Sequence, residues 1–178
     1  LSWDTEKFWI LKVLNFHNGN SIEDLANLYR SHYPFFGDLI WALFWKISLI
    51  SEEYAGRLFF AFFYVISIST LIQNLKLTKI YKFIFITLII LSTYNYRELL
   101  SGNKEVIIFS LFCLLLSCIY QFNKKKCQFE TYYLVFFIVT SKLIIWTKQE
   151  GFIYLITLIL SILFFSNLHN KKKLIILL

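Results

Sequence analysis

Side chains that could carry acid–base and phosphate chemistry occur in five short polar clusters, separated by long apolar stretches. The clusters combine carboxylates, cations and aromatic rings at positions 4–12, 30–34, 97–98, 104–105 and 148–150. Lysine and arginine hold phosphate through charge-assisted hydrogen bonds, and a carboxylate can accept a proton from an attacking hydroxyl. If the fold brings the clusters together, they suit a reaction between a lipid-linked phosphate and a polar acceptor.

Taken one at a time, the same residues have simpler explanations. Asp4 stands where a helix N-cap is needed, Lys12 can extend its ammonium toward lipid headgroups, and His32 fits a solvated loop. The charges at 104–105 and 148–150 are compatible with ordinary loops. Chemistry is therefore indicated by the convergence of the clusters and by no single residue.

The composition assigns the apolar stretches to a membrane. Of the 178 residues, 58% are hydrophobic and only 16% are charged. A soluble domain carries about a quarter charged residues, so this chain has too few polar side chains to cover a globule. A soluble enzyme, a disordered tail and a disulfide scaffold are excluded. We expect an all-α, polytopic transmembrane helix bundle.

Five stretches approach the length of about 20 apolar residues that a crossing helix needs. Their approximate bounds, within a membrane region of 58–173, are 58–75, 83–98, 105–122, 131–147 and 152–168. Residues 174–178 are also apolar and predict the start of a further helix. Because the chain in addition begins at Leu1 and not at Met, we expect a fragment of a longer protein.

Charge indicates which loops face the cytoplasm. Three of the five loops that follow the predicted spans hold nine lysines and one acid, and the positive-inside rule places these loops in the cytoplasm. Ten of the eleven acidic residues, and all five polar clusters, then lie on the outer face. Cys113, Cys118 and Cys127 do not reach that face, so neither a disulfide nor a thiolate zinc site is expected.

Residues 1–57 are predicted to form an outer loop of short helices along the membrane surface. Asp4 or Thr5 can cap a first helix that ends near His17, and the segment 21–24 has capping-box spacing for a second helix that ends near Tyr29. Both helices are expected to be amphipathic and to lie next to the membrane.

The apolar run 34–50 is predicted to lie on the membrane and not to cross it. It contains Asp38 and Lys46, each of which costs about 2.5–3.5 kcal/mol near the centre of a crossing helix. A crossing here would also place Asp4 and its neighbours in the cytoplasm, on the face opposite to the clusters at 97–98, 104–105 and 148–150. We therefore expect a surface helix with Asp38, Ala42 and Lys46 on its polar side.

Several of these stretches resemble motifs of the GT-C glycosyltransferases, integral membrane enzymes that include the protein O-mannosyltransferases and the aminoarabinose transferase of lipid A. The motifs are short, but they keep the family order from residue 3 to residue 151. They are Trp3-Asp4 with Trp9 and Lys12, His32-Tyr33-Pro34, Glu53 to Leu58, Ser101 to Val106, and Thr147 to Gly151.

The resemblance implies a sugar transfer, with inversion, from a polyprenyl-phosphate donor to a hydroxyl of a glycan, lipid or protein acceptor. It places this reaction at the outer face of a bacterial plasma membrane and implies no nucleic-acid partner. Asp4 would be the catalytic base. The implied substrate-binding residues are Lys12, Arg30, His32, Tyr33, Glu105, Lys148 and Glu150.

The match to the family departs at two positions. Glu105 stands where the family has aspartate, and His32 directly precedes Tyr33, where relatives have two intervening residues. Some relatives use a divalent metal and others do not, and the residues of this chain leave that question open.

A multi-pass transporter or lipid-handling protein without transferase activity is the alternative. Such a protein is expected to place polar groups near the middle of the membrane, often at Gly or Pro breaks in its helices. Here most charges stand at the ends of the predicted spans, and Pro34 lies outside them. This distribution favours chemistry at the membrane surface.

Overall fold

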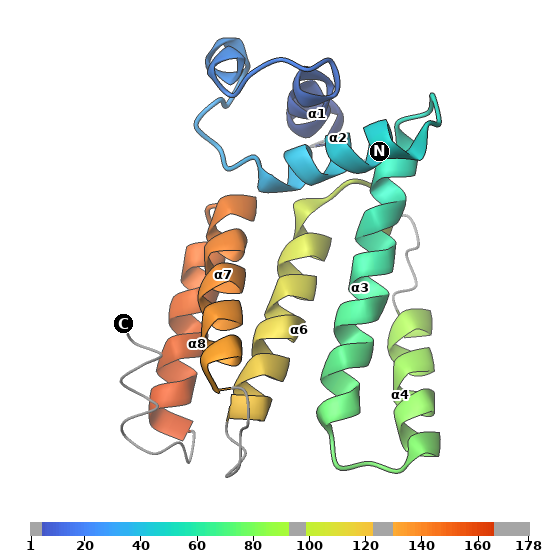
Figure 1. Cartoon of the computed structure of the whole chain (residues 1–178), viewed down its shortest axis with the longest axis vertical. Helices are drawn as coiled ribbons and strands as arrows, with labels where there is room; N and C mark the ends of the chain where they lie inside the picture. The colour runs from blue at the N-terminus through green and yellow to red at the C-terminus, as the bar shows by residue number, and fades with distance from the viewer. Residues whose placement is uncertain (1–4, 93–98, 123–129, 166–178) are drawn as a thin grey trace.

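The computed structural model describes residues 5–92, 99–122 and 130–165, which form a bundle of long helices covered at one end by a layer of short ones (Figure 1). The described residues form helices and no strand. The all-α prediction is therefore confirmed.

The layer is built from the segment that was expected to form an outer loop. Its elements are η1 (Thr5–Trp9), α1 (Ile10–His17), η2 (Glu23–Asn27) and α2 (Phe36–Ser48). The π-helical turn η1 continues directly into α1. The 3-10 turn η2 is shorter than the expected helix because Leu28 is already extended, with ψ of 151°.

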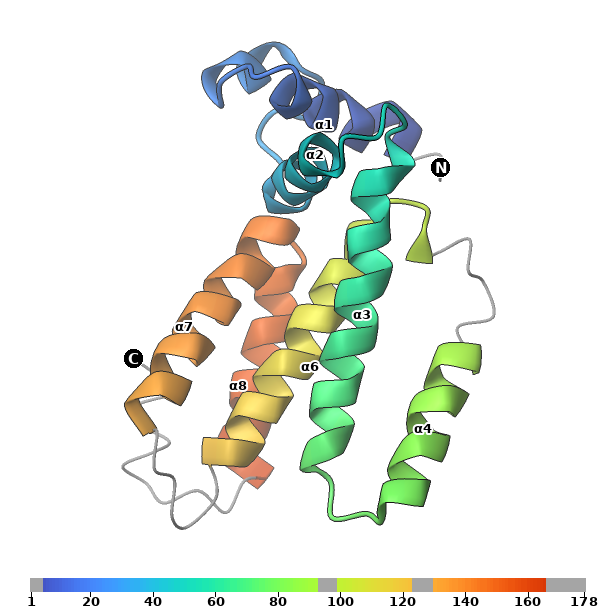
Figure 2. The same ribbon diagram turned by 45° about the vertical axis from the view of Figure 1, so that its right-hand side comes forward.

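The bundle contains α3 (Tyr54–Asn74), α4 (Lys79–Ser92), α6 (Lys104–Phe122), α7 (Glu130–Thr147) and α8 (Gly151–Phe165). They run side by side in both views of the ribbon (Figures 1 and 2). Helix α6 packs between α3 and α7, while α4 packs on α3 and α8 on α7. The core helix α6 therefore connects the two halves of the bundle.

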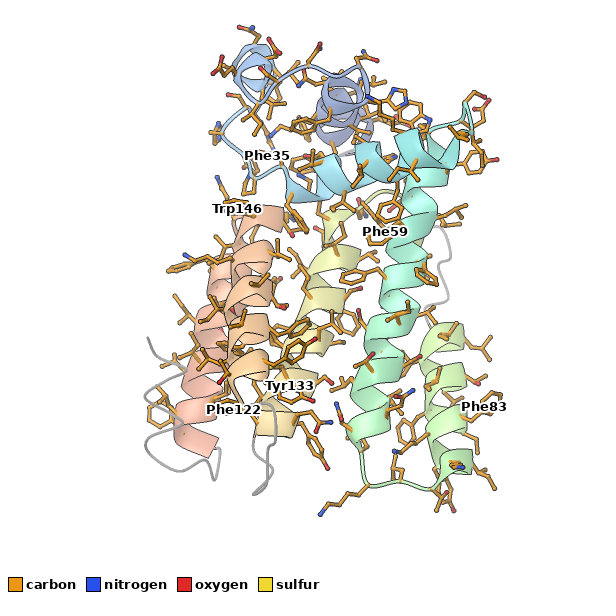
Figure 3. The ribbon with its side chains drawn as sticks, in the orientation of Figure 1. Phe35, Phe59, Phe83, Phe122, Tyr133 and Trp146 are labelled. Carbon is orange, nitrogen blue, oxygen red and sulfur yellow. The ribbon has the colours of Figure 1, made fainter. Side chains whose placement is uncertain are left out.

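Two of these helices, α3 and α6, are long and apolar enough to cross a membrane, whereas the apolar parts of α7 and α8 are shorter. The outside of the bundle exposes large apolar side chains, among them Phe62 (62% exposed) and Phe83 (71%). Figure 3 shows Phe83 pointing away from the other helices. An exposed apolar surface of this kind supports membrane association.

Helix α2 crosses the ends of the long helices and does not run parallel to them (Figures 1 and 2). Of the three residues expected on its polar side, Lys46 is exposed, but the prediction was wrong for the other two. Asp38 and Ala42 are buried at 1% and 2% exposure, while Leu43 and Ile47 are exposed at 47% and 63%. The reason is that Asp38 meets a buried cation from α6, a partner that a local sequence pattern does not reveal.

Trp41 of α2 joins the layer to the bundle. Its indole nitrogen donates a hydrogen bond of 3.0 Å to the carbonyl of Glu53, and its ring lies edge-on to Phe60 of α3. A Cβ built on Gly56 would lie 2.3 Å from the carbonyl oxygen of Trp41. The close approach of α2 to α3 therefore requires glycine at position 56.

Candidate functional site

An aromatic cluster holds Arg30 in the layer. The cluster consists of Phe8, Trp9, Tyr29 and Tyr33, and the guanidinium carbon of Arg30 lies 4.1 Å from the ring centre of Phe8 and 5.2 Å from that of Tyr33. Arg30 has a φ of 56°, a left-handed conformation that costs about 1–2 kcal/mol outside glycine. Stacking on the aromatic rings offsets this cost and fixes the loop before α2.

Lys12 of α1 is fully buried beside this cluster. Its ammonium donates a hydrogen bond of 2.8 Å to the carbonyl of Tyr33 and lies 5.9 Å from the ring centre of Trp9. Burial lowers the pKa of Lys12 to about 8, although the charge of Asp38 partly offsets this effect. Lys12 thus fixes the loop at Tyr33. Its implied contact with phosphate stays a prediction.

Asp38 and Lys104 form a buried ion pair that the sequence did not indicate as a pair. The ammonium of Lys104 lies 2.8 Å from Oδ2 of Asp38, and both side chains are at most 2% exposed. Burial raises the pKa of the Asp38 carboxyl to about 6, and the neighbouring ammonium limits the rise. The signal that could have drawn attention to Asp38 is an acid within an apolar run, which is expensive without a partner.

A charged groove lies at the start of α6, close to the layer. It has a volume of about 410 Å³ and is lined by Glu105, Ile108, Phe109, Phe112, Lys148, Glu150 and Tyr154. At its charged end the ammonium of Lys148 lies 2.5 Å from Glu105 and 3.8 Å from Glu150. The other lining residues are apolar or aromatic, so the groove offers one charged end and an apolar wall.

Local sequence explains how the charged end is built. Glu105 stands in the first turn of α6, and Lys148 and Glu150 lie in the tight turn between α7 and α8. That turn closes with a hydrogen bond of 3.0 Å from the amide of Gly151 to the carbonyl of Lys148. A Cβ at Gly151 would lie 2.4 Å from the carbonyl oxygen of Ile144, so the two helices can meet this closely only at glycine.

The structure thus divides the predicted site residues between two neighbouring places. Lys12, Arg30 and Tyr33 belong to the aromatic cluster, and His32 is an exposed residue whose ring centre lies 4.9 Å from that of Tyr33. Glu105, Lys148 and Glu150 belong to the charged groove. Asp4, Arg97 and Glu98 lie outside the described residues.

Two consecutive residues of α6 connect these places. Lys104 contacts the ring of Trp9 in the aromatic cluster, with its ammonium 3.7 Å from the ring centre. Glu105, the next residue, contacts Lys148 in the charged groove. The first turn of α6 is therefore where the layer and the groove meet.

The residues around the charged groove do not fit a divalent metal. Both carboxylates there pair with the ammonium of Lys148, which occupies the position that a cation would need. Across the described ranges, no three His, Cys, Asp or Glu side chains come close enough together to hold a metal ion.

The chain matches no protein-family model, no curated protein and no solved structure.

Proposed function

We propose that this chain is part of a polytopic membrane glycosyltransferase of the GT-C type. It would transfer a sugar, with inversion, from a polyprenyl-phosphate donor to an acceptor hydroxyl at the extracytoplasmic face of a bacterial plasma membrane. In this proposal all five bundle helices cross the membrane and the layer lies on the outer surface. The exposed apolar residues of α3, α4, α7 and α8 support this arrangement because lipid would cover them.

The charged groove is the observation that carries the proposal. A polyprenyl phosphate has its charge at the membrane surface and its chain in the hydrocarbon layer. The groove has the same polarity, since Lys148 and two carboxylates stand at the end of α6 nearest the layer and Ile108, Phe109 and Phe112 follow along that helix. Phosphate at the charged end and isoprenoid along the apolar wall would satisfy both parts of such a lipid.

Each charged residue has a distinct proposed role. Lys148 exchanges its carboxylate partners for the donor phosphate, and the carboxylates of Glu105 and Glu150 accept hydrogen bonds from sugar hydroxyls. Arg30 and His32 supply further polar contacts from the loop before α2. Lys12 supports that loop through the carbonyl of Tyr33.

The proposed reaction is a single displacement. The acceptor oxygen forms a bond to the anomeric carbon while the bond from that carbon to the phosphate oxygen breaks. The acceptor proton passes to the carboxylate of Asp4, and polyprenyl phosphate leaves with the electron pair of the broken bond. Attack opposite to the leaving group inverts the anomeric centre.

The test compares wild type with Lys148→Ala for binding of a short-chain polyprenyl phosphate in detergent and for sugar transfer in membranes. We expect Lys148→Ala to weaken lipid binding at least tenfold, since a hydrogen bond to a charged group contributes about 1.5–3 kcal/mol. Lys142→Ala is the matched control because this exposed lysine lies on α7 but outside the groove.

The two readouts separate the proposed function from its alternative. Wild-type binding that depends on Lys148, together with sugar transfer, supports the transferase. Binding that depends on Lys148 without any transfer by the full-length protein would favour a lipid-handling protein. Equal binding by wild type and Lys148→Ala would contradict the assignment of the groove.

A further inference from the structure

Lys104 is the residue through which the first turn of α6 contacts the layer. Its ammonium donates hydrogen bonds of 2.8 Å to the carboxylate of Asp38 and of 2.8 Å to the carbonyl of Pro34. It also lies 3.7 Å from the ring centre of Trp9. One buried side chain therefore connects α6 to α2, to the loop before α2 and to η1.

Burying the Asp38–Lys104 ion pair costs desolvation energy. Its main effect is therefore on the orientation of the two helices and not on stability. Desolvating two charges offsets most of their attraction, and apolar side chains of similar size are often as stable at such positions. An ion pair with two directed hydrogen bonds, unlike an apolar contact, holds one orientation. The Asp38–Lys104 pair is thus suited to fixing how the first turn of α6 sits under the layer.

The first turn of α6 is weakly held by its own backbone hydrogen bonds, so side-chain contacts must fix its position. Gly102, two residues before the helix, has a φ of 82°, and the hydrogen bond from the amide of Val106 to the carbonyl of Asn103 is long at 3.4 Å. The side chain of Glu105 is 62% exposed and so has little packing of its own. Its carboxylate is held by Lys148 and by the backbone of the first turn, which Lys104 anchors to the layer.

We propose that Asp38 and Lys104 are positioning residues that hold Glu105 over the charged groove, opposite Lys148. The consequence for transfer rests on the proposed function, in which Glu105 binds the sugar. The structural consequence, an ordered first turn of α6, does not depend on that function. The two consequences can be measured separately.

The deciding variant is Asp38→Leu/Lys104→Met in the full-length protein, which replaces the ion pair by an apolar pair of similar size. We expect amide exchange at residues 105–107 to become at least tenfold faster while the thermal midpoint of unfolding stays near that of wild type. In the sugar-transfer assay kcat should fall about 10- to 100-fold at a KM within twofold of wild type, because small misplacement of a substrate-contacting group has effects of this size.

Asn74→Leu is the matched control. Asn74 of α3 donates to Ser117 and accepts from Gln121 at the opposite end of α6. This control also removes a polar contact between α6 and another helix, and it should leave both kcat and the exchange at residues 105–107 unchanged. Equal changes in the control and in the double variant would contradict positioning by Asp38 and Lys104.

A second variant keeps the test decisive if the double variant does not fold. Asp38→Asn retains an oxygen acceptor for Lys104 but removes the charge, and the same faster exchange and lower kcat are expected. Wild-type exchange and wild-type kcat in a folded variant would overturn the proposal. If wild type shows no sugar transfer, the proposed function fails, and the exchange measurement alone decides the positioning role.

Discussion

Gly102 lies directly against the indole ring of Trp41. A Cβ built on Gly102 would be 2.4 Å from Cζ3 of that ring, and the φ of Gly102 is 82°. We expect Gly102→Ala to destabilise the protein by about 2–5 kcal/mol, from about 1–2 for the left-handed backbone and about 1–3 for the forced repacking. Thermal unfolding in detergent measures this effect.

Gly19→Ala is the control that separates the two contributions. Gly19 has nearly the same φ of 83°, but a Cβ built on it would meet no atom within 4 Å. This variant should therefore show only the backbone cost. Equal thermal midpoints for the two variants would mean that Trp41 moves away at little cost.

Asp4 is expected to act as the general base, although it lies outside the described residues. Asp4→Asn should lower the turnover of sugar transfer by about 10²–10⁴, the usual value of general-base assistance. If Asp4 only caps a helix, asparagine would replace it with little loss, because asparagine caps about as well as aspartate. Turnover in membranes at equal protein levels decides between these roles.

Asp24→Asn is the control for Asp4. Asp24 lies in η2 and accepts hydrogen bonds from the backbone amide and the hydroxyl of Ser21, at 2.7 and 3.0 Å. It therefore caps a turn without any proposed part in the reaction. A loss of turnover as large as that of Asp4→Asn would show that the loss of a carboxylate with no part in the reaction lowers turnover equally, which would contradict the role of Asp4 as the base.

The lysine-rich loops are expected to face the cytoplasm, and Cys127 is a probe of this topology. Cys127 lies outside the described residues, while Cys113 and Cys118 are buried and should react slowly. A membrane-impermeant thiol reagent should label Cys127 only after cells are permeabilised. Ser21→Cys, at an exposed position of the layer, should be labelled in intact cells. If Cys127 is labelled in intact cells and Ser21→Cys only after permeabilisation, the orientation in the membrane is opposite to the predicted one.

The lowered pKa of Lys12 predicts that the stability of the protein changes with pH in a specific range. Burial lowers the pKa of Lys12 from 10.5 to about 8. Between these values the folded state holds fewer protons on Lys12 than the unfolded state, so this contribution to stability increases as pH rises from 8 to 10.5. Below pH 8 both states are protonated and the contribution is constant.

The measurement compares thermal midpoints of wild type, Lys12→Met and Lys46→Met between pH 7 and pH 10. Subtracting the Lys12→Met curve from that of wild type should leave a difference that grows in favour of wild type above pH 8. Lys46→Met is the matched control because it removes an exposed lysine from α2. Parallel curves for wild type and Lys12→Met would contradict the lowered pKa.

The sequence by itself determined that the protein is helical and where polar residues separate its apolar segments. Apolar runs of helical length predicted the helices of the bundle, and the charged breaks between these runs marked the turn that contains Lys148 and Glu150. These features are local, because hydropathy and helix caps depend on neighbours within a few residues. The nearness of Glu105 to Lys148 was expected only as a convergence of clusters.

Only the tertiary structure decided which charges are paired and buried. Asp38 was expected on a polar surface, yet its partner Lys104 stands 66 residues later in the sequence. Lys12 is buried and donates a hydrogen bond to the carbonyl of Tyr33, a contact that the sequence did not indicate. A charge within an apolar run must either reach water or find a partner. Which of the two happens depends on how distant helices pack.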